Sequence, residues 1–161
     1  MGPNSIDRKA EEISKTDIKE VALDVKKIIL ATDGSTPSIE ATRYAVALAK
    51  ILKAELIAVY VDEQSALLLE EKYEEEVFEG VKHSPAGLQV ARWYGEKNGI
   101  EVKTIVKQGS APKRIIFTAE EEEADLIVIG TTGRTGLKRI AIGSVAEMVV
   151  KAAHVPVLVV R

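Results

Sequence analysis

The sequence of 161 residues contains no cysteine. This absence excludes disulfide bonds, catalysis by a thiolate and zinc sites built on sulfur ligands. Only two histidines are present, His83 and His154, and aromatic residues make up 4% of the chain. A single histidine before a strand, as at His154, is more often structural than catalytic. Cysteine and histidine therefore offer little for nucleophilic or acid–base catalysis.

Two other features are missing, a strong charge imbalance and a long apolar run. The net charge is −3 and the calculated isoelectric point about 5.6, so the bulk charge does not favour nucleic acid as a partner. No apolar run approaches the length that spans a bilayer, and no signal-peptide pattern opens the chain. We expect a cytoplasmic protein with neither a nucleic-acid nor a membrane partner.

The chain is long enough for one α/β domain and too short for two of ordinary size. Residues 1–25 are polar and mixed in charge, with isolated apolar positions such as Ile6 and Ile13. They predict an N-terminal arm, either solvated or formed into one amphipathic helix that lies on the body or on a partner. The body is expected over residues 26–161.

Short apolar runs and helical periodicities alternate along the body. Strands are predicted at 27–32, 56–61, 102–106, 126–129 and 156–160, and helices at 37–52, 67–79, 85–98, 110–122 and 144–153. Thr36 is the expected cap of the first of these helices, with Pro37 at its first position. Strict alternation predicts an open five-stranded parallel sheet, doubly wound, with helices on both faces.

The most informative motif follows the fourth predicted strand. It reads Gly130-Thr131-Thr132-Gly133, then nine residues, then Gly143-Ser144 at the start of a predicted helix. A strand, a glycine loop and a helix N-terminus together form the backbone arrangement that holds phosphate. The segment carries three cations and no acidic residue: Arg134, Lys138 and Arg139. It matches neither the Walker P-loop nor the Gly-x-Gly-x-x-Gly fingerprint.

A structural interpretation of the same residues stays open. Ser144 and Glu147 fit the spacing of a capping box, in which Ser144 would serve its own helix. Gly130 and Gly133 would then be turn glycines.

Asp33 directly follows the first predicted strand, so it lies at the same sheet edge as Gly130. Ligands of open parallel sheets bind at this edge. The carboxylate suits ribose hydroxyls or a hydrated magnesium ion beside phosphates. Alternatively, Asp33 caps a helix or forms an Asx turn. Gly34 and Ser35 would supply room and further donors.

With these motifs the sequence resembles the universal stress protein family. The nucleotide-binding members carry Gly-x-x-Gly, nine residues, and Gly-Ser or Gly-Thr, which this chain matches fully. The opening stretch 27–35 and the closing stretch 154–160 are also similar to the family. The resemblance covers residues 26–161 and implies an adenine-nucleotide alpha-hydrolase-like sheet of strand order 3-2-1-4-5.

The resemblance also implies a role for particular residues. It places Asp33 near the ribose and the backbone of Val61 beside adenine, with Ala31 and Thr32 lining the base pocket. It assigns the phosphates to five residues: Gly130, Gly133, Gly143, Ser144 and Val145. Ser35 completes the expected binding set. The implied ligand is ATP, ADP or AMP, with or without Mg²⁺, and the implied assembly is a homodimer paired through Pro156 to Val160.

Three functional hypotheses follow. The first is a nucleotide-binding stress-response module that acts as a dimer on an unknown protein partner. The second is a slow or partner-activated ATPase, although no catalytic residue or metal motif is evident in the sequence. The third is a nucleotide-free interaction protein or scaffold.

Overall fold

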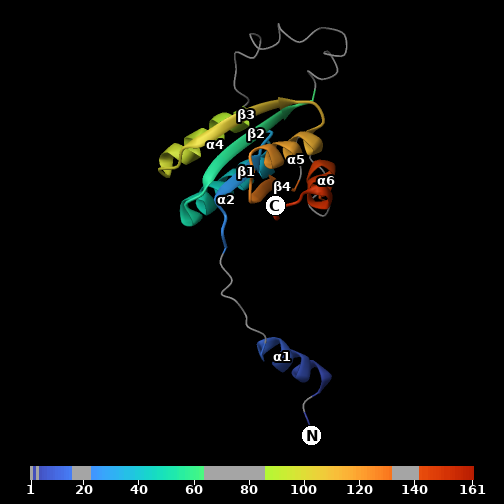
Figure 1. Cartoon of the computed structure of the whole chain (residues 1–161). Coiled ribbons are helices and arrows are strands. Elements are labelled where there is room, and N and C mark those ends of the chain that lie inside the picture. The colour runs from blue at the N-terminus through green and yellow to red at the C-terminus, as the bar shows by residue number, and fades with distance from the viewer. Residues whose placement is uncertain (1, 3, 16–22, 64–85, 132–141) are drawn as a thin grey trace.

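The computed structural model describes residues 2, 4–15, 23–63, 86–131 and 142–161. The chain alternates between helices and strands after an N-terminal helix (Figure 1). The strands are β1 (Lys27–Ala31), β2 (Glu55–Asp62), β3 (Val102–Gln108), β4 (Leu126–Gly130) and β5 (Val157–Val160). The helices are α1 (Ser5–Lys15), α2 (Thr36–Leu52), α4 (Ala86–Lys97), α5 (Ala111–Glu121) and α6 (Ser144–Ala152).

The five strands form one sheet in the order β3-β2-β1-β4-β5, and every neighbouring pair is parallel. The predicted fold class and strand order are therefore confirmed. The order reverses between β1 and its two neighbours, β2 and β4. In open parallel sheets this reversal leaves a crevice at the carboxyl edge. The topology thus fixes where a ligand site can form.

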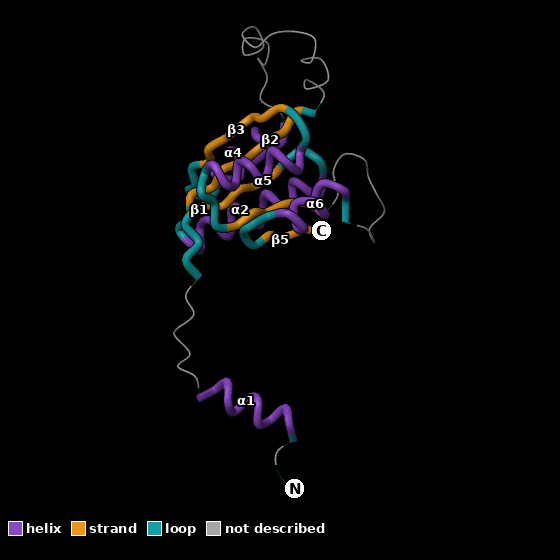
Figure 2. Tube along the Cα trace, turned by 45° about the vertical axis from the view of Figure 1, so that its right-hand side comes forward, coloured by secondary structure: helices purple, strands orange, loops and turns teal. Residues whose placement is uncertain are grey.

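Two hydrophobic layers sandwich the sheet. Ile28 and Leu30 of β1 pack with α2 and α4 on one face, whereas Ile29 and Ala31 pack with α5 and α6 on the other. This division follows from the strand period of two, which sends successive side chains to opposite faces. Figure 2 shows the strands running between the helices. Burial on both faces explains why β1 reads as a continuous apolar run.

The helix boundaries differ from the prediction by a residue or two. Ser35, not Thr36, caps α2, because its hydroxyl accepts a hydrogen bond from the backbone N–H of Ser38 at 3.4 Å. The predicted stop of α4 at Asn98-Gly99 is confirmed, since Gly99 has a φ of +71°. The helix predicted at 67–79 lies outside the described residues.

Asp125 joins two strands at the amino edge of the sheet. Its Oδ2 atom accepts hydrogen bonds from the backbone N–H groups of Lys26 at 2.8 Å and Lys27 at 3.0 Å. The carboxylate thus fastens the start of β1 to the start of β4. This edge of the sheet is opposite to the crevice, so Asp125 lies far from the expected ligand site.

The N-terminal arm contains the helix α1, whose start is capped by Asn4. The Asn4 Oδ1 atom accepts from the N–H groups of Ile6 and Asp7, and the Asp7 carboxylate accepts from the N–H of Asn4. This reciprocal pair stabilises the first turn. Among the described residues, no helix is long and apolar enough to cross a membrane.

Candidate functional site

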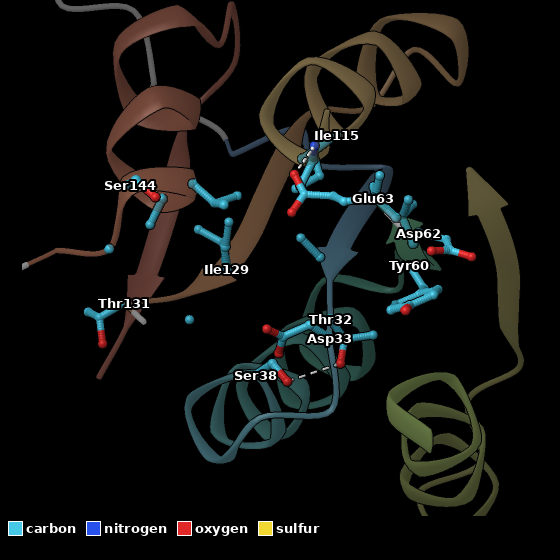
Figure 3. Close-up of a pocket in the computed structure, with 18 residues that line it drawn as sticks. Thr32, Asp33, Ser38, Tyr60, Asp62, Glu63, Ile115, Ile129, Thr131 and Ser144 are labelled. Atoms are coloured by element: carbon cyan, nitrogen blue, oxygen red, sulfur yellow. Dashed lines mark hydrogen bonds between the residues drawn. The ribbon is translucent and has the colours of Figure 1, made fainter. Parts of the chain in front are cut away.

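A cavity of about 460 Å³ opens at the carboxyl edge of the sheet, between the ends of β1, β2 and β4 (Figure 3). Its walls combine strand ends with the first turns of helices. The lining residues are Ala31, Thr32, Asp33, Ser38, Val59, Tyr60, Val61, Asp62, Glu63, Ala111, Ile115, Ile129, Gly130, Thr131, Gly143, Ser144, Val145 and Ala146. The cavity lies where the topology predicts a ligand site.

Three helix N-termini border this cavity. Ser38 comes from the first turn of α2, Ala111 opens α5, and Ser144 opens α6. The first four N–H groups of a helix have no partner within the helix, and the macrodipole gives this end a partial positive charge. The cavity is therefore suited to a negatively charged ligand.

Two of the three N-termini already hold a side-chain oxygen. Ser35 accepts from Ser38 at the start of α2. Glu63 accepts from the N–H of Ala111 through its Oε1 atom at 2.9 Å, and so satisfies the start of α5. At α6 the cap residue is Gly143, which has no side chain to offer. Among the described residues, α6 is thus the N-terminus best placed to receive an external anion.

Ser144 is the first residue of α6 and not its cap. The capping-box interpretation of Ser144 and Glu147 is therefore wrong, because the box requires the serine at the cap position. Glu147 instead contacts Lys151, with 2.6 Å between Oε1 and Nζ. The hydrogen bond and the charge of Lys151 lower the pKa of Glu147. The exposed Ser144 side chain is left at the cavity wall (Figure 3).

The glycine at the end of β4 has a packing reason. A Cβ atom on Gly130 would lie 2.7 Å from the carbonyl carbon of Pro37, so only glycine lets the strand end contact the start of α2. The next residue, Thr131, makes two backbone hydrogen bonds. Its N–H donates to the carbonyl of Val160 at 2.8 Å, and its carbonyl accepts from the N–H of Gly143 at 2.5 Å. These bonds set the position of α6 against the sheet.

The peptide groups of Val61 face the cavity side of β2. The β1–β2 ladder ends at the Ala31–Val59 pair, after which the N–H of Thr32 donates to the carbonyl of Val59 at 3.0 Å. Peptide groups two residues apart in a parallel strand face the same neighbour. The N–H and carbonyl of Val61 therefore point toward the space beyond the end of β1. A ligand in that space can form the hydrogen bonds that a longer β1 would have formed.

Carboxylates line a second part of the cavity. Asp33 is half-buried, and its Oδ1 atom accepts from the N–H of Ser35 at 2.9 Å. The Asx-turn interpretation is thus present in the structure, and it orients the carboxylate at the cavity wall. Asp62 and Glu63 extend from the end of β2 (Figure 3). Among the described residues, no cluster of histidine and acidic side chains has a geometry suited to a metal ion.

Most of the residues predicted to bind a ligand line this one cavity. Ser35 is not among the lining residues; it caps α2 and bonds to Asp33 and Ser38, which do line the cavity. Gly133 lies outside the described residues, as do His83 and the three cations Arg134, Lys138 and Arg139. The residues brought together at the cavity are Ala31, Thr32, Asp33, Val61, Gly130, Gly143, Ser144 and Val145.

Sequence reasoning missed the acidic end of β2 and the start of α5. Glu63 and Ala111 are 48 residues apart, so no local pattern pairs them. Ser38 and Ile129 were read only as parts of a helix and a strand. The available signal was topological, because each missed residue directly flanks the carboxyl end of a strand or the first turn of a helix.

Comparisons with known proteins agree on one family. A model of the Universal stress protein family matches residues 24–161. The chain is 41% identical to Universal stress protein MJ0531 of Methanocaldococcus jannaschii over 146 residues, which cover 84% of this chain and 82% of that protein.

Solved structures agree with this result. A structure of MJ0577, a universal stress protein of Methanocaldococcus jannaschii, has a TM-score of 0.71 at 31% identity and covers 86% of this chain and 96% of its own. A universal stress protein in complex with cAMP has a TM-score of 0.66 at 26% identity, covering 86% of this chain and 99% of its own.

Proposed function

The chain belongs to the universal stress protein family, and we propose that it is an adenine-nucleotide-binding regulatory module of the ATP-binding branch that acts as a dimer. The ligand we propose is ATP, with ADP and AMP as competitors for the same cavity. Magnesium is expected to accompany the phosphates without dedicated protein ligands.

The observation that carries the proposal is the N-terminus of α6. It opens on a cavity at the carboxyl edge, and its cap residue Gly143 offers no side chain. Ser144 and Val145 add backbone N–H donors, and Ser144 also adds a hydroxyl, for the phosphates. Gly133 is included in the proposed phosphate site because of its place in the sequence motif. Hydrogen bonds to charged groups contribute about 1.5–3 kcal/mol each, so a few of them support micromolar binding.

The other end of the cavity suits a nucleoside. Val61 offers a backbone donor and acceptor beside the apolar side chains of Ala31 and Ile129. The carboxylate of Asp33, which accepts from the N–H of Ser35, is the group that we propose for the ribose hydroxyls. Support for an adenine nucleotide also comes from the related universal stress protein that was solved with cAMP. The proposed binding set is Ala31, Thr32, Asp33, Ser35, Val61, Gly130, Gly133, Gly143, Ser144 and Val145.

Calorimetric titration of ATP into nucleotide-free protein tests the proposal. Ser144→Ala should weaken binding by about tenfold or more, because one charge-assisted hydrogen bond is lost. Ser110→Ala is the matched control, since Ser110 also stands at a helix start, makes no capping bond and lies outside the cavity wall. Equal loss in both variants, or no ATP binding by the parent protein, would contradict the phosphate assignment.

Val61→Pro tests the adenine end separately. The substitution removes the backbone N–H of Val61. This N–H has no hydrogen-bond partner in the β1–β2 ladder, which ends at the Ala31–Val59 pair, so the ladder is kept. ATP affinity should fall while affinity for inorganic triphosphate stays unchanged. Phosphate release measured on the same samples separates a binding module from the ATPase alternative, for which a steady rate above blank would be needed.

A further inference from the structure

The helix α1 carries an apolar stripe in its sequence, and the two stripe residues whose side chains the structure describes, Ile6 and Ala10, are exposed. Ile6 and Ala10 lie one turn apart on it, and Ile13 follows at the spacing that returns to the same face. Ile6 is 75% exposed, and neither hydrophobic cluster contains any of the α1 residues whose side chains the structure describes, 5–12. Helices shorter than about 12–15 residues are marginal in water without tertiary packing, so α1 needs a surface to stabilise it.

A matching stripe lies on the exposed flank of α2. Tyr44 is 54% and Ile51 75% exposed, and the half-buried Leu48 lies between them. The positions 44, 48 and 51 repeat the spacing of 6, 10 and 13. Each stripe therefore follows one face of its helix over about two turns, so both present an apolar edge of similar length.

The arm leaves the body beside this stripe. Val25 packs against the same cluster as Leu48 and Leu52, on the α2 face of the sheet. The N–H of Glu55, just after α2, donates to the carbonyl of Lys26 at 2.8 Å. The end of α2 and the start of the body are therefore neighbours at the amino edge, as the chain trace also indicates (Figure 1).

The connection is long enough for α1 to reach any part of α2. Nine residues, 16–24, join Lys15 to Val25 and span about 30 Å when extended. The 17 residues of α2 have a length of about 25 Å. We propose that α1 folds back on its own chain and docks its Ile6–Ala10–Ile13 stripe on the Tyr44–Leu48–Ile51 stripe of α2, so that the arm is a built-in cover for this surface.

The absence of cysteine makes the proposal directly testable in the full chain. The double variant Ala10→Cys with Ala47→Cys places one small thiol within the α1 stripe and one beside the α2 stripe, because Ala47 borders the α2 stripe and is exposed. The control pair is Ala10→Cys with Lys97→Cys, since Lys97 is exposed at the end of α4 near the same sheet edge. Both pairs share one tether, so random encounters are comparable.

We expect a disulfide within one chain to form about tenfold faster or more in the Ala47 pair than in the Lys97 pair, because docking raises the effective concentration. Adding Ile6→Asp should reduce the rate to that of the control, whereas Arg8→Asp on the opposite face of α1 should leave it unchanged. Equal rates for the two pairs would overturn the proposal. Linkage only between chains would overturn it too, in favour of docking on a second copy.

Discussion

Single residues at the carboxyl edge of the sheet show which parts of the site could be predicted from the sequence and which could not. Asp33 and Ser144 could be placed at the cavity because each stands directly at the end of an apolar run or at the start of a helical period. The Asx turn of Asp33 was one of two interpretations that the sequence left open, whereas the cap of α6 was misassigned because Gly143 and Ser144 are neighbours. Glu63 was hidden because its partner, Ala111, is distant in sequence.

Gly87, at the start of α4, packs closely against the loop that carries Asp33. Gly87 itself does not line the cavity. A Cβ atom there would lie 2.5 Å from Oγ1 of Thr32 and 2.8 Å from the backbone nitrogen of Gly34. Gly87→Ala should therefore displace this loop and weaken ATP binding several-fold in calorimetry. Gln89→Ala, at an exposed position of the same helix, should have no effect. Unchanged affinity in Gly87→Ala would show that the loop adapts.

Asp125 is expected to contribute to the stability of the fold and not to ligand binding. Asp125→Ala removes the acceptor of two backbone N–H groups and should lower the free energy of unfolding by about 1–3 kcal/mol, measured by denaturant titration. Asp24→Ala is the control, since its contact with Lys26 is highly exposed and worth little. ATP affinity should be kept in both variants because Asp125 lies at the far edge from the cavity.

Whole elements were predicted better than their ends. The central strands β1 and β4 appeared as apolar runs because the sheet is covered on both faces there, and α4 ended where Gly99 permits a positive φ. The start of α2 was misplaced by one residue, because Ser35 and Thr36 are neighbours of similar capping ability. The start of α6 at Ser144 was predicted correctly, whereas the capping-box alternative was wrong because the cap residue is Gly143 and not Ser144.

The exposed pair on α6 predicts a pH effect. The pKa of Glu147 is lowered from its ordinary value of 4.5 by its contact with Lys151. A carboxyl whose pKa is lower in the folded state stabilises the fold above the unfolded pKa, and loses that contribution as the pH falls through the folded pKa. Lys151→Ala should bring the pKa of Glu147 back toward its ordinary value in an NMR titration. Glu96, on α4, serves as the internal reference, and a shift common to both would contradict the assignment.

At the scale of the molecule, alternation of strands and helices predicted the sheet, and the resemblance predicted its order. The arm could not be decided from sequence, since a short helix with one apolar stripe has no preferred state until it meets a surface. The proposed dimer involves the other end of the chain, the strand β5 at one edge of the sheet. Its apolar residues would form an unpaired sheet edge in a monomer.

Val159→Pro tests this dimer without disturbing the chain's own sheet. The carbonyls of Pro156 and Val160 accept from β4, so peptide groups two residues apart face inward and those of Val159 face the free edge. Proline removes that outward N–H. We expect sedimentation to change from dimer to monomer with little loss of thermal stability, and Val157→Ala to remain dimeric. A monomeric parent protein, or a dimeric Val159→Pro variant, would contradict the pairing.

The two bonds of Thr131 have a thermodynamic consequence. This one residue contacts the edge strand β5 through its N–H and the start of α6 through its carbonyl, so it connects the proposed subunit contact with the proposed phosphate site. Linkage between two sites is reciprocal. If a bound nucleotide strengthens subunit association by some factor, association must strengthen nucleotide binding by the same factor. The occupancy of the cavity would then depend on protein concentration as well as on nucleotide concentration.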